Sequence, residues 1–150
     1  MFSAAALAAL DLLVKFTVLQ GLGHGSHGTA MNFGWINIRV AYNTGIGFGL
    51  GPWLPPWAVD AAAAVFFAVL AVFLIRSAGR MTAPSGAGAA LILGGGLGNF
   101  VDRLDGPGVV NYLHTGWFPA FNLADVFVVA GAGLLFLGTV RGLVRKKTKP

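Results

Sequence analysis

Long apolar segments constrain this chain more than any other feature of its sequence. The stretch from Trp57 to Ile75 holds 19 residues, and Asp60 is its only charged one. A helix needs about 20 mostly apolar residues to cross the hydrocarbon core of a bilayer. Three further segments have similar character, and together the four predict spans over residues 2–22, 57–75, 81–101 and 121–140. The sequence therefore predicts a single-domain, all-α membrane protein with four transmembrane helices.

The composition supports this fold class and excludes several others. Hydrophobic residues make up 56% of the chain and charged residues only 10%, whereas a soluble domain carries about 25% charged residues. The chain has no cysteine, which excludes disulfides, thiolate metal sites and a cysteine nucleophile. The net charge of +5 does not require nucleic acid, because half of the ten basic residues lie in segment 141–150. Such a cluster beside an apolar helix is typical of a cytoplasmic anchor that contacts anionic lipid.

The basic residues also predict the orientation in the membrane. Arg76 and Arg80 lie between the second and third predicted spans, and residues 141–150 form a basic C-terminal tail. Since Lys and Arg gather in cytoplasmic loops, both regions and both termini are expected on the cytoplasmic side. Asp11 and Lys15 would interrupt the apolar region of a cleavable signal peptide, so the first segment is predicted to remain as a span.

The loop between the first two spans is predicted to form a small extracytoplasmic β-platform. Residues 35–42 alternate apolar and polar side chains, as a half-buried strand does. Prolines at 52, 55 and 56 then end regular structure before the second span. Trp53 and Trp57 are expected at the depth of the membrane interface, where Trp is enriched. We therefore expect the platform to lie on the outer membrane surface.

Two glycine-rich stretches are interpreted structurally. Residues 21–28 are predicted to be a flexible linker, and His24 and His27 within it lack a third ligand, so no metal site is expected. The third predicted span contains glycines at 94, 95, 96 and 98. Small residues at such spacing favour close packing of membrane helices. A phosphate-binding loop would need a following Lys and an aqueous setting, so we do not predict one.

The acidic residues mark the candidate sites. All five are Asp, and most lie in or beside the apolar segments. An ionisable group at membrane depth is costly, so it indicates a functional site or a paired structural one. Asp11 and Lys15 are four residues apart and share a helix face, which predicts a structural ion pair. Asp125 has no basic neighbour in the sequence and is the strongest catalytic candidate.

Asparagines and one Asp–Arg pair add polar groups near the ends of the spans. Asn43 follows the predicted strand, where it either forms a turn or holds a peptide backbone. Asn99, Asp102 and Arg103 end the third span, where Asp102 and Arg103 either neutralise each other or pair elsewhere. Asn122 lies at the start of the fourth span, where its side chain can cap the helix N-terminus. These residues gather the polar groups toward one end of the predicted bundle.

Five blocks of residues follow one another along nearly the whole chain. They are Asp11-x-x-x-Lys15, Ala41-Tyr-Asn-Thr-Gly-x-x-Phe48, Gly94-Gly-Gly-x-Gly-Asn99-x-x-Asp102-Arg103, Val109-Val110-Asn111-Tyr112 and Phe118-Pro-Ala-Phe-Asn122-x-Ala-Asp125. This ordered set resembles the lipoprotein signal peptidase (signal peptidase II) family. The resemblance implies an intramembrane aspartyl peptidase of the bacterial inner membrane, with its active site on the extracytoplasmic side. Such an enzyme removes the signal peptide from diacylglyceryl-modified prolipoproteins and needs neither cofactor nor metal.

The resemblance also implies two catalytic positions, and only one of them holds an acid. Asp125 matches one Asp of the family's dyad, while Asn111 stands where the family has the other. In a dyad one carboxyl acts as base toward water while the other acts as acid toward the scissile carbonyl. The Asn111 amide is nearly isosteric with Asp but does not titrate, so ordinary dyad chemistry is not available to this sequence.

Further roles follow from the resemblance alone. Residues implied to bind the substrate are Asn43, Gly45, Asn99, Arg103 and Asn122, and residues implied to support the structure are Asp11, Lys15 and Asp102, with Asp102 orienting Arg103. The implied partners are the lipid-modified signal peptide of a prolipoprotein, membrane lipid, and an inhibitor of the globomycin type, a cyclic lipopeptide.

Several interpretations of Asn111 stay open at the level of sequence. The Asp-to-Asn difference is an introduced change that traps substrate, or the chain is a natural pseudoenzyme that binds lipoproteins or lipid without cutting. Alternatively, another group replaces the missing acid, with Asp102 and Asp105 the nearest candidates and His114 a weaker one. A small transporter-like bundle is a further alternative, although the sequence offers neither the inverted repeats nor the broken helices typical of transporters.

Overall fold

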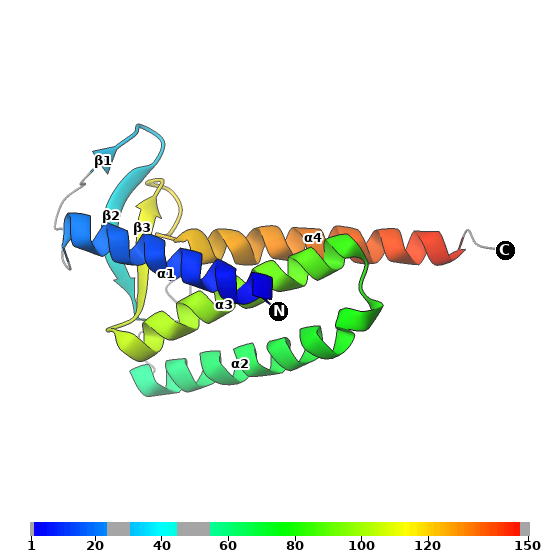
Figure 1. The fold of residues 1–150 in the computed structure, drawn as a ribbon. Helices are drawn as coiled ribbons and strands as arrows, with labels where there is room; N and C mark the ends of the chain where they lie inside the picture. The colour runs from blue at the N-terminus through cyan, green and yellow to red at the C-terminus, as the bar shows by residue number, and fades with distance from the viewer. Residues whose placement is uncertain (1, 24–30, 45–54, 148–150) are drawn as a thin grey trace.

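The computed structural model describes residues 2–23, 31–44 and 55–147. Within them the long helices are α1 (Phe2–Leu22), α2 (Pro56–Ser77), α3 (Ala83–Asp105) and α4 (Leu123–Lys147), as Figure 1 shows. A short 3-10 helix, η1 (Ala78–Arg80), joins α2 to α3. The strands are β1 (Met31–Asn32), β2 (Asn37–Asn43) and β3 (Val109–His114). Gly45, His24, His27 and Trp53 lie outside the described residues, as does most of the predicted linker.

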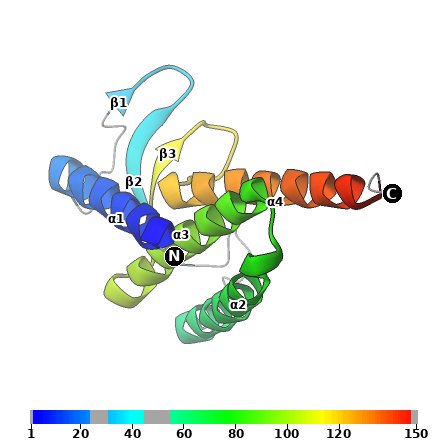
Figure 2. The ribbon, with the colours of Figure 1, turned by 45° about the vertical axis from the view of Figure 1, so that its right-hand side comes forward.

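The central helix is α3, which packs against α1, α2 and α4. In Figure 2, α2 stands to one side of the other three helices. Glycine makes the close contacts of α3 possible. A Cβ at Gly94 would lie 2.6 Å from the Cβ of Leu7 on α1, and a Cβ at Gly88 would lie 2.5 Å from the carbonyl oxygen of Gly131 on α4. The predicted close packing through small residues is therefore confirmed.

Three of the described helices are long and apolar enough to cross a membrane. They cover Ser3–Leu22, Trp57–Arg80 and Leu123–Val144. The predicted third span corresponds to α3, which has 23 residues and thus sufficient length. It is not among the three, because its six glycines and the polar residues near its C-terminal end lower its hydropathy. Length and composition together therefore support three membrane helices, and α3 is the fourth long helix packed among them.

The sheet is antiparallel, with the strand order β1-β2-β3. The predicted strand at residues 35–42 is confirmed in β2, which covers Asn37–Asn43. The sequence did not predict β3, which follows α3 and pairs with β2 so that Asn111 lies opposite Ala41. The platform is therefore built from both inter-helix connections on that side and not only from the first. It lies at the end of the bundle where α1 and α3 end and α4 begins (Figure 1).

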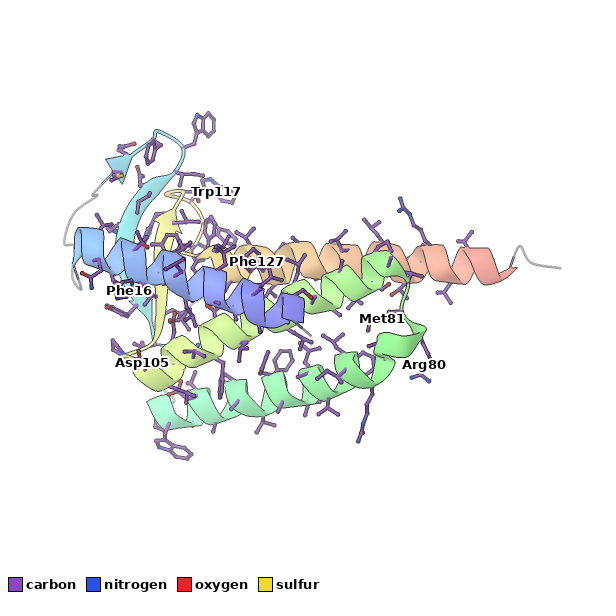
Figure 3. All side chains as sticks on the ribbon, in the orientation of Figure 1. Phe16, Arg80, Met81, Asp105, Trp117 and Phe127 are labelled. Carbon is purple, nitrogen blue, oxygen red and sulfur yellow. The ribbon has the colours of Figure 1, made fainter. Side chains whose placement is uncertain are left out.

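Two helix boundaries differ from the predicted ones. The third helix continues past residue 101 to Asp105, so Asp102 and Arg103 lie on its last turn. The fourth begins at Leu123, two residues after the predicted start, and continues through Lys147. Most of the predicted basic tail at 141–150 is therefore helical. The end of α4 and the turn that carries Arg80 and Met81 both lie at the end of the molecule away from the sheet (Figure 3).

Candidate functional site

The first turn of α4 places Asp125 through a reciprocal cap. The Asn122 side-chain oxygen accepts a hydrogen bond from the Asp125 backbone N–H at 2.9 Å, and Asp125 Oδ2 accepts one from the Asn122 backbone N–H at 3.0 Å. This arrangement is a capping box, with Asn in the N-cap position and an acid three residues later. The predicted capping role of Asn122 is confirmed. Since the cap holds its carboxylate, Asp125 has a defined orientation at the start of the helix.

Two other side chains complete the start of α4. The Leu123 backbone N–H donates to the Tyr112 hydroxyl at 3.2 Å, and the Ala124 backbone N–H donates to Asp11 Oδ1 at 2.8 Å. The first N–H groups of a helix have no partner within the helix, so α1 and β3 supply acceptors here. Burial raises the pKa of Tyr112 to about 12, which keeps its hydroxyl neutral. No pattern in the sequence indicates this role for Tyr112.

The Asn122 amide nitrogen connects three parts of the site. It lies 2.9 Å from Asn111 Oδ1, 3.0 Å from Asn99 Oδ1 and 3.1 Å from the Val110 carbonyl oxygen. An amide nitrogen has two hydrogens, so one of them is shared between two acceptors. The side chain is fully buried. Asn122 therefore ties β3 and α3 to the first turn of α4, in addition to capping that helix.

The hydrogen-bond partners of residue 111 match the donor and the acceptor of an amide side chain. The Asn111 nitrogen donates to the Ala120 carbonyl oxygen at 2.7 Å, while its oxygen accepts from Asn122. The side chain is only 5% exposed. An Asp at this position would direct a carboxyl oxygen at the Ala120 carbonyl, and only a protonated carboxyl donates there. The surroundings of residue 111 thus suit a neutral hydrogen-bond donor.

The Lys15 side chain is buried, with only 2% of it exposed. Its ammonium lies 2.7 Å from Asp11 Oδ2, which confirms the predicted ion pair, and 2.7 Å from Asp102 Oδ2. It also donates to Asn99 Oδ1 at 2.9 Å. The Asn99 nitrogen in turn donates to Asp125 Oδ1 at 2.9 Å. A continuous chain of contacts therefore joins α1 to Asp125 through α3.

The structure corrects the expectation that Asp102 orients Arg103. Asp102 pairs with Lys15 and accepts a hydrogen bond from the Val110 backbone N–H at 3.0 Å. The Arg103 guanidinium instead reaches Asp60 on α2 at 3.0 Å. Consecutive helical residues point about 100° apart, so Asp102 faces α1 and β3 while Arg103 faces α2. The Arg103–Asp60 contact could not be inferred from spacing, because 43 residues separate the two.

A cavity of about 550 Å³ opens beside this network. Asn43, Asn111 and Asp125 line it from β2, β3 and α4, so the structure brings both predicted dyad positions to one cavity. The remaining lining is apolar, from Phe118, Pro119, Ala120, Phe121, Val126, Val128, Val129 and Ala130. Figure 3 shows Trp117 in the adjoining connection between β3 and α4. An apolar cavity with one carboxyl and two amides can hold an acyl chain beside a peptide group.

The remaining candidates lie elsewhere. Asn99, Asn122 and Arg103 are engaged with other side chains as described, and none of the three lines the cavity. Asp105 is exposed at the end of α3, as its place in Figure 3 shows. The His114 ring lies 2.8 Å from the Arg39 carbonyl oxygen, beside a separate cavity of about 490 Å³. Across the described ranges, no three His or Asp side chains gather as a metal ion would require.

Sequence comparisons match this chain to one family of known proteins. The profile of the family described as Signal peptidase (SPase) II matches residues 3–141. Proteins named lipoprotein signal peptidase from Burkholderia cenocepacia (strain HI2424) and Burkholderia vietnamiensis (strain G4 / LMG 22486) are each 36% identical over 137 residues, which covers 87% of this chain and 81% of theirs.

The fold itself has been seen before. A bacterial membrane enzyme solved by the in meso method at 2.3 Å superposes with a TM-score of 0.81 at 20% identity, covering 99% of this chain and 92% of that one. A second, solved at 1.9 Å, gives a TM-score of 0.72 at 19% identity, covering 91% and 88%. At this identity the likeness concerns the fold alone, and the family rests on the sequence matches. By those matches, this chain belongs to the signal peptidase II family.

Proposed function

We propose that this chain binds diacylglyceryl-modified prolipoproteins in the bacterial inner membrane and carries the peptidase site of its family with one catalytic position altered. Asp125 is the remaining catalytic carboxyl, and Asn111 occupies the place of its partner. The observation that carries the proposal is that both side chains, from different elements, line one apolar cavity. Its apolar walls suit the lipid part of the substrate, and its three polar side chains suit the peptide part.

The proposed reaction needs two proton transfers. Asp125 as a carboxylate accepts a proton from water, so that the oxygen of that water attacks the scissile carbonyl. A second acid must then protonate the carbonyl oxygen and later the leaving nitrogen. Asn111 has no proton to give. Its second amide N–H makes no hydrogen bond among the described residues, so it is available to polarise the carbonyl without completing the transfer.

The surrounding polar residues would place the substrate. Asn43 lines the cavity from β2 and is proposed to hold the peptide backbone, and Gly45, outside the described residues, remains a prediction for the same role. Arg103 is proposed to contact the lipid-modified peptide near its ion pair with Asp60. Membrane lipid surrounds the bundle. Both termini are proposed to be cytoplasmic and the sheet extracytoplasmic, since Arg80 and the basic end of α4 lie opposite the sheet.

A second function is favoured by the surroundings of Asn111. Its amide nitrogen donates one hydrogen bond to the Ala120 carbonyl, and its oxygen accepts one from Asn122. An ionised Asp would lose the first contact and face a carbonyl oxygen. A chain that binds lipoproteins or lipid without cutting would have no use for that charge. This pseudoenzyme hypothesis predicts tight binding of a lipidated prolipoprotein without product.

The deciding experiment compares the chain with its Asn111→Asp variant on a lipidated prolipoprotein. Both proteins are purified in lipid nanodiscs and assayed for cleavage and for binding of the substrate and of globomycin. Asn32→Asp is a matched control, because it makes the same chemical change at an exposed position in β1. We expect both proteins to bind substrate and only the Asn111→Asp variant to cleave it.

Each other outcome has a definite meaning. Cleavage by both proteins would contradict the assignment of Asn111 to the catalytic pair. Cleavage by neither, with binding retained, would favour the pseudoenzyme. Binding by neither would refute the proposed substrate class. Cleavage gained by Asn32→Asp would show that added negative charge, rather than its position, is responsible.

A further inference from the structure

The Lys15 ammonium has three close oxygen partners in the interior of the bundle. Asp11 Oδ2 and Asp102 Oδ2 each lie 2.7 Å away, and Asn99 Oδ1 lies 2.9 Å away. An ammonium only donates: that of Lys15 donates a hydrogen bond to Asn99, and its contacts with the two carboxylates are ion pairs, without hydrogen-bond geometry at Asp11 Oδ2. A simple i, i+4 ion pair on α1 would need only Asp11. The other two acceptors belong to α3, and each leads to a different member of the candidate site.

The first path runs through Asn99 to Asp125. Because Lys15 only donates, the Asn99 oxygen must face it, and the Asn99 nitrogen then faces Asp125 Oδ1 at 2.9 Å. Asn122 fixes the same orientation independently, since its nitrogen donates to Asn99 Oδ1 at 3.0 Å while its oxygen accepts from the Asp125 backbone. An amide can otherwise be turned either way. Lys15 and Asn122 together therefore determine that Asp125 meets a donor and not an acceptor.

The second path runs through Asp102 to the strand that carries residue 111. Asp102 Oδ2 binds both the Lys15 ammonium and the Val110 backbone N–H, at 2.7 Å and 3.0 Å. Val110 directly precedes Asn111 in β3. The carboxylate of Asp102 is 9% exposed and would be costly to bury without a cation. Because Lys15 supplies the cation that Asp102 needs, the Asp102 carboxylate can hold β3 beside the cavity through the Val110 N–H.

Asp11 anchors the ammonium and the start of α4 together. Its Oδ2 binds Lys15, and its Oδ1 accepts from the Ala124 backbone N–H, one residue before Asp125. A Cβ at Gly98 would lie 2.5 Å from Asp11 Oδ2, so only glycine leaves room for this carboxylate between α1 and α3. The three acceptors of Lys15 consequently connect it to α4, to α3 and to β3.

We propose that Lys15 is the positioning residue of this site, which sets the side chain of Asp125 through Asn99 and the backbone of residue 111 through Asp102. The inference rests on the proposed function only for the catalytic role of Asp125. It changes the role implied for Asn99, because both ends of that amide are used inside the protein. Asn99 then acts on Asp125 and does not bind the substrate.

The first test reads the amide network directly and needs no turnover. The chain, with Asn111 retained, is labelled with ¹⁵N-asparagine in nanodiscs, and the side-chain amide signals are assigned by single substitutions. Lys15→Met removes the ammonium from a chain of similar length. We expect the Asn99 and Asn122 amide signals to move, while the signal of exposed Asn32 stays in place. Thr17→Val, an exposed change on the same helix, should move neither.

The outcome is decisive in both directions. If folded Lys15→Met protein keeps the Asn99 and Asn122 signals unchanged, Lys15 only joins α1 to α3 and the proposal is wrong. Lys15→Gln replaces Lys15→Met if that variant does not fold, because a Gln amide still donates to carboxylates but carries no charge. For Lys15→Gln, too, unchanged Asn99 and Asn122 signals in the folded protein would contradict the proposal.

The second test separates positioning from substrate binding, in the Asn111→Asp background. Asn99→Leu removes the hydrogen bonds of Asn99 with Lys15 and with Asp125. The ion pairs of Lys15 with Asp11 and Asp102 remain. Titration with globomycin counts the binding sites, so that kcat refers to folded protein. We expect kcat to fall at least about tenfold, as for a misplaced catalytic group, with KM unchanged. A raised KM with unchanged kcat would contradict the proposal. If Asn111→Asp does not cleave at all, the proposed function fails, and the amide signals still decide the role of Lys15.

Discussion

Helices α3 and α4 meet at both ends of the molecule, and the two contacts use different chemistry. At the end away from the sheet, the Thr82 hydroxyl caps α3 by accepting from the Ser85 backbone N–H and donates to the Gly138 carbonyl oxygen at 3.1 Å. The Ser85 hydroxyl reaches the Leu135 carbonyl oxygen at 3.5 Å. All of these groups are neutral, and they suffice to cap a helix and join it to its neighbour.

At the sheet end the contact between α3 and α4 includes a carboxylate of α4 and, from α1, an ammonium. Asn99 on α3 bridges the Lys15 ammonium and the Asp125 carboxylate. Buried charges at membrane depth are expensive, and the hydroxyl contact shows that packing alone does not require them. The difference teaches that the charges at the sheet end serve something other than holding α3 to α4. The charges lie next to the cavity that Asp125 lines, so we infer that they serve this cavity.

The largest expected effect follows from removing the carboxylate at the sheet end. In the cleaving form of the protein, Asp125→Asn should lower turnover by about 10²–10⁴-fold, because the amide cannot accept a proton from water. Expression and globomycin binding should remain, since an Asn still accepts one of the two hydrogen bonds that hold Asp125. Cleavage of a lipidated prolipoprotein measures the effect.

Ser85→Ala is the matched change at the other end. It removes a buried hydroxyl from the same helix pair, and we expect turnover per folded molecule to stay within about twofold, with about 0.5–1.5 kcal/mol of stability lost. Retained turnover in Asp125→Asn would refute its catalytic role. An equal loss of turnover in both variants would erase the distinction between the two ends.

The next effect concerns Gly98, which leaves room for the Asp11 carboxylate and its ion pair with Lys15. Gly98→Ala would place a methyl group 2.5 Å from Asp11 Oδ2, so the ion pair with Lys15 must shift. We expect a loss of about 1–3 kcal/mol in the free energy of unfolding, as for overpacked interiors. Gly86→Ala, on the same helix, meets nothing within 4 Å and should stabilise α3 by up to about 1 kcal/mol. Unfolding in mixed micelles measures both, and equal effects would contradict the close approach at Gly98.

A smaller difference is expected between the two caps. Thr82→Ala should cost about 1 kcal/mol, the usual value of an N-cap. Asn122→Ala removes a cap and also the donor to Asn99, Asn111 and the Val110 carbonyl, so we expect about 2–4 kcal/mol. Unfolding of the two variants under the same conditions gives the comparison. Equal costs would mean that the Asn122 amide contributes nothing beyond the cap.

Local patterns in the sequence predicted much of this arrangement. The apolar segments gave the helices to within a few residues at most ends, and the i, i+4 spacing gave the Asp11–Lys15 pair. The position of Asn122 before an apolar segment predicted its cap. The crowded glycines predicted the tight packing of α3. Each of these features depends on residues that are neighbours along the chain or on one helix face.

The features that were missed depend on contacts between distant segments. β3 is a short strand whose partner, β2, lies some 70 residues earlier, so no local pattern marks it as part of the platform. Asp102 was expected to turn toward its neighbour Arg103, but the approach of α1 gives it Lys15 instead. α3 was expected to be a span like the others, but its glycines serve packing and its hydropathy is too low for it to be counted with the three apolar helices. Such pairings are decided by tertiary structure.

The smallest effect is expected at the other ion pair between helices, Arg103 with Asp60. Asp60 is 42% exposed, and pairs of this kind contribute about 0–1 kcal/mol. Asp60→Asn should therefore cost less than Thr82→Ala, although it breaks an ion pair and Thr82→Ala removes only a hydroxyl. Thermal unfolding in nanodiscs, at low and at high salt, measures the difference. A loss of several kcal/mol would place Arg103–Asp60, which joins α3 to α2, with Lys15 among the charges that the bundle depends on. It would then contradict the view that charged contacts between the helices serve only the cavity beside Asp125.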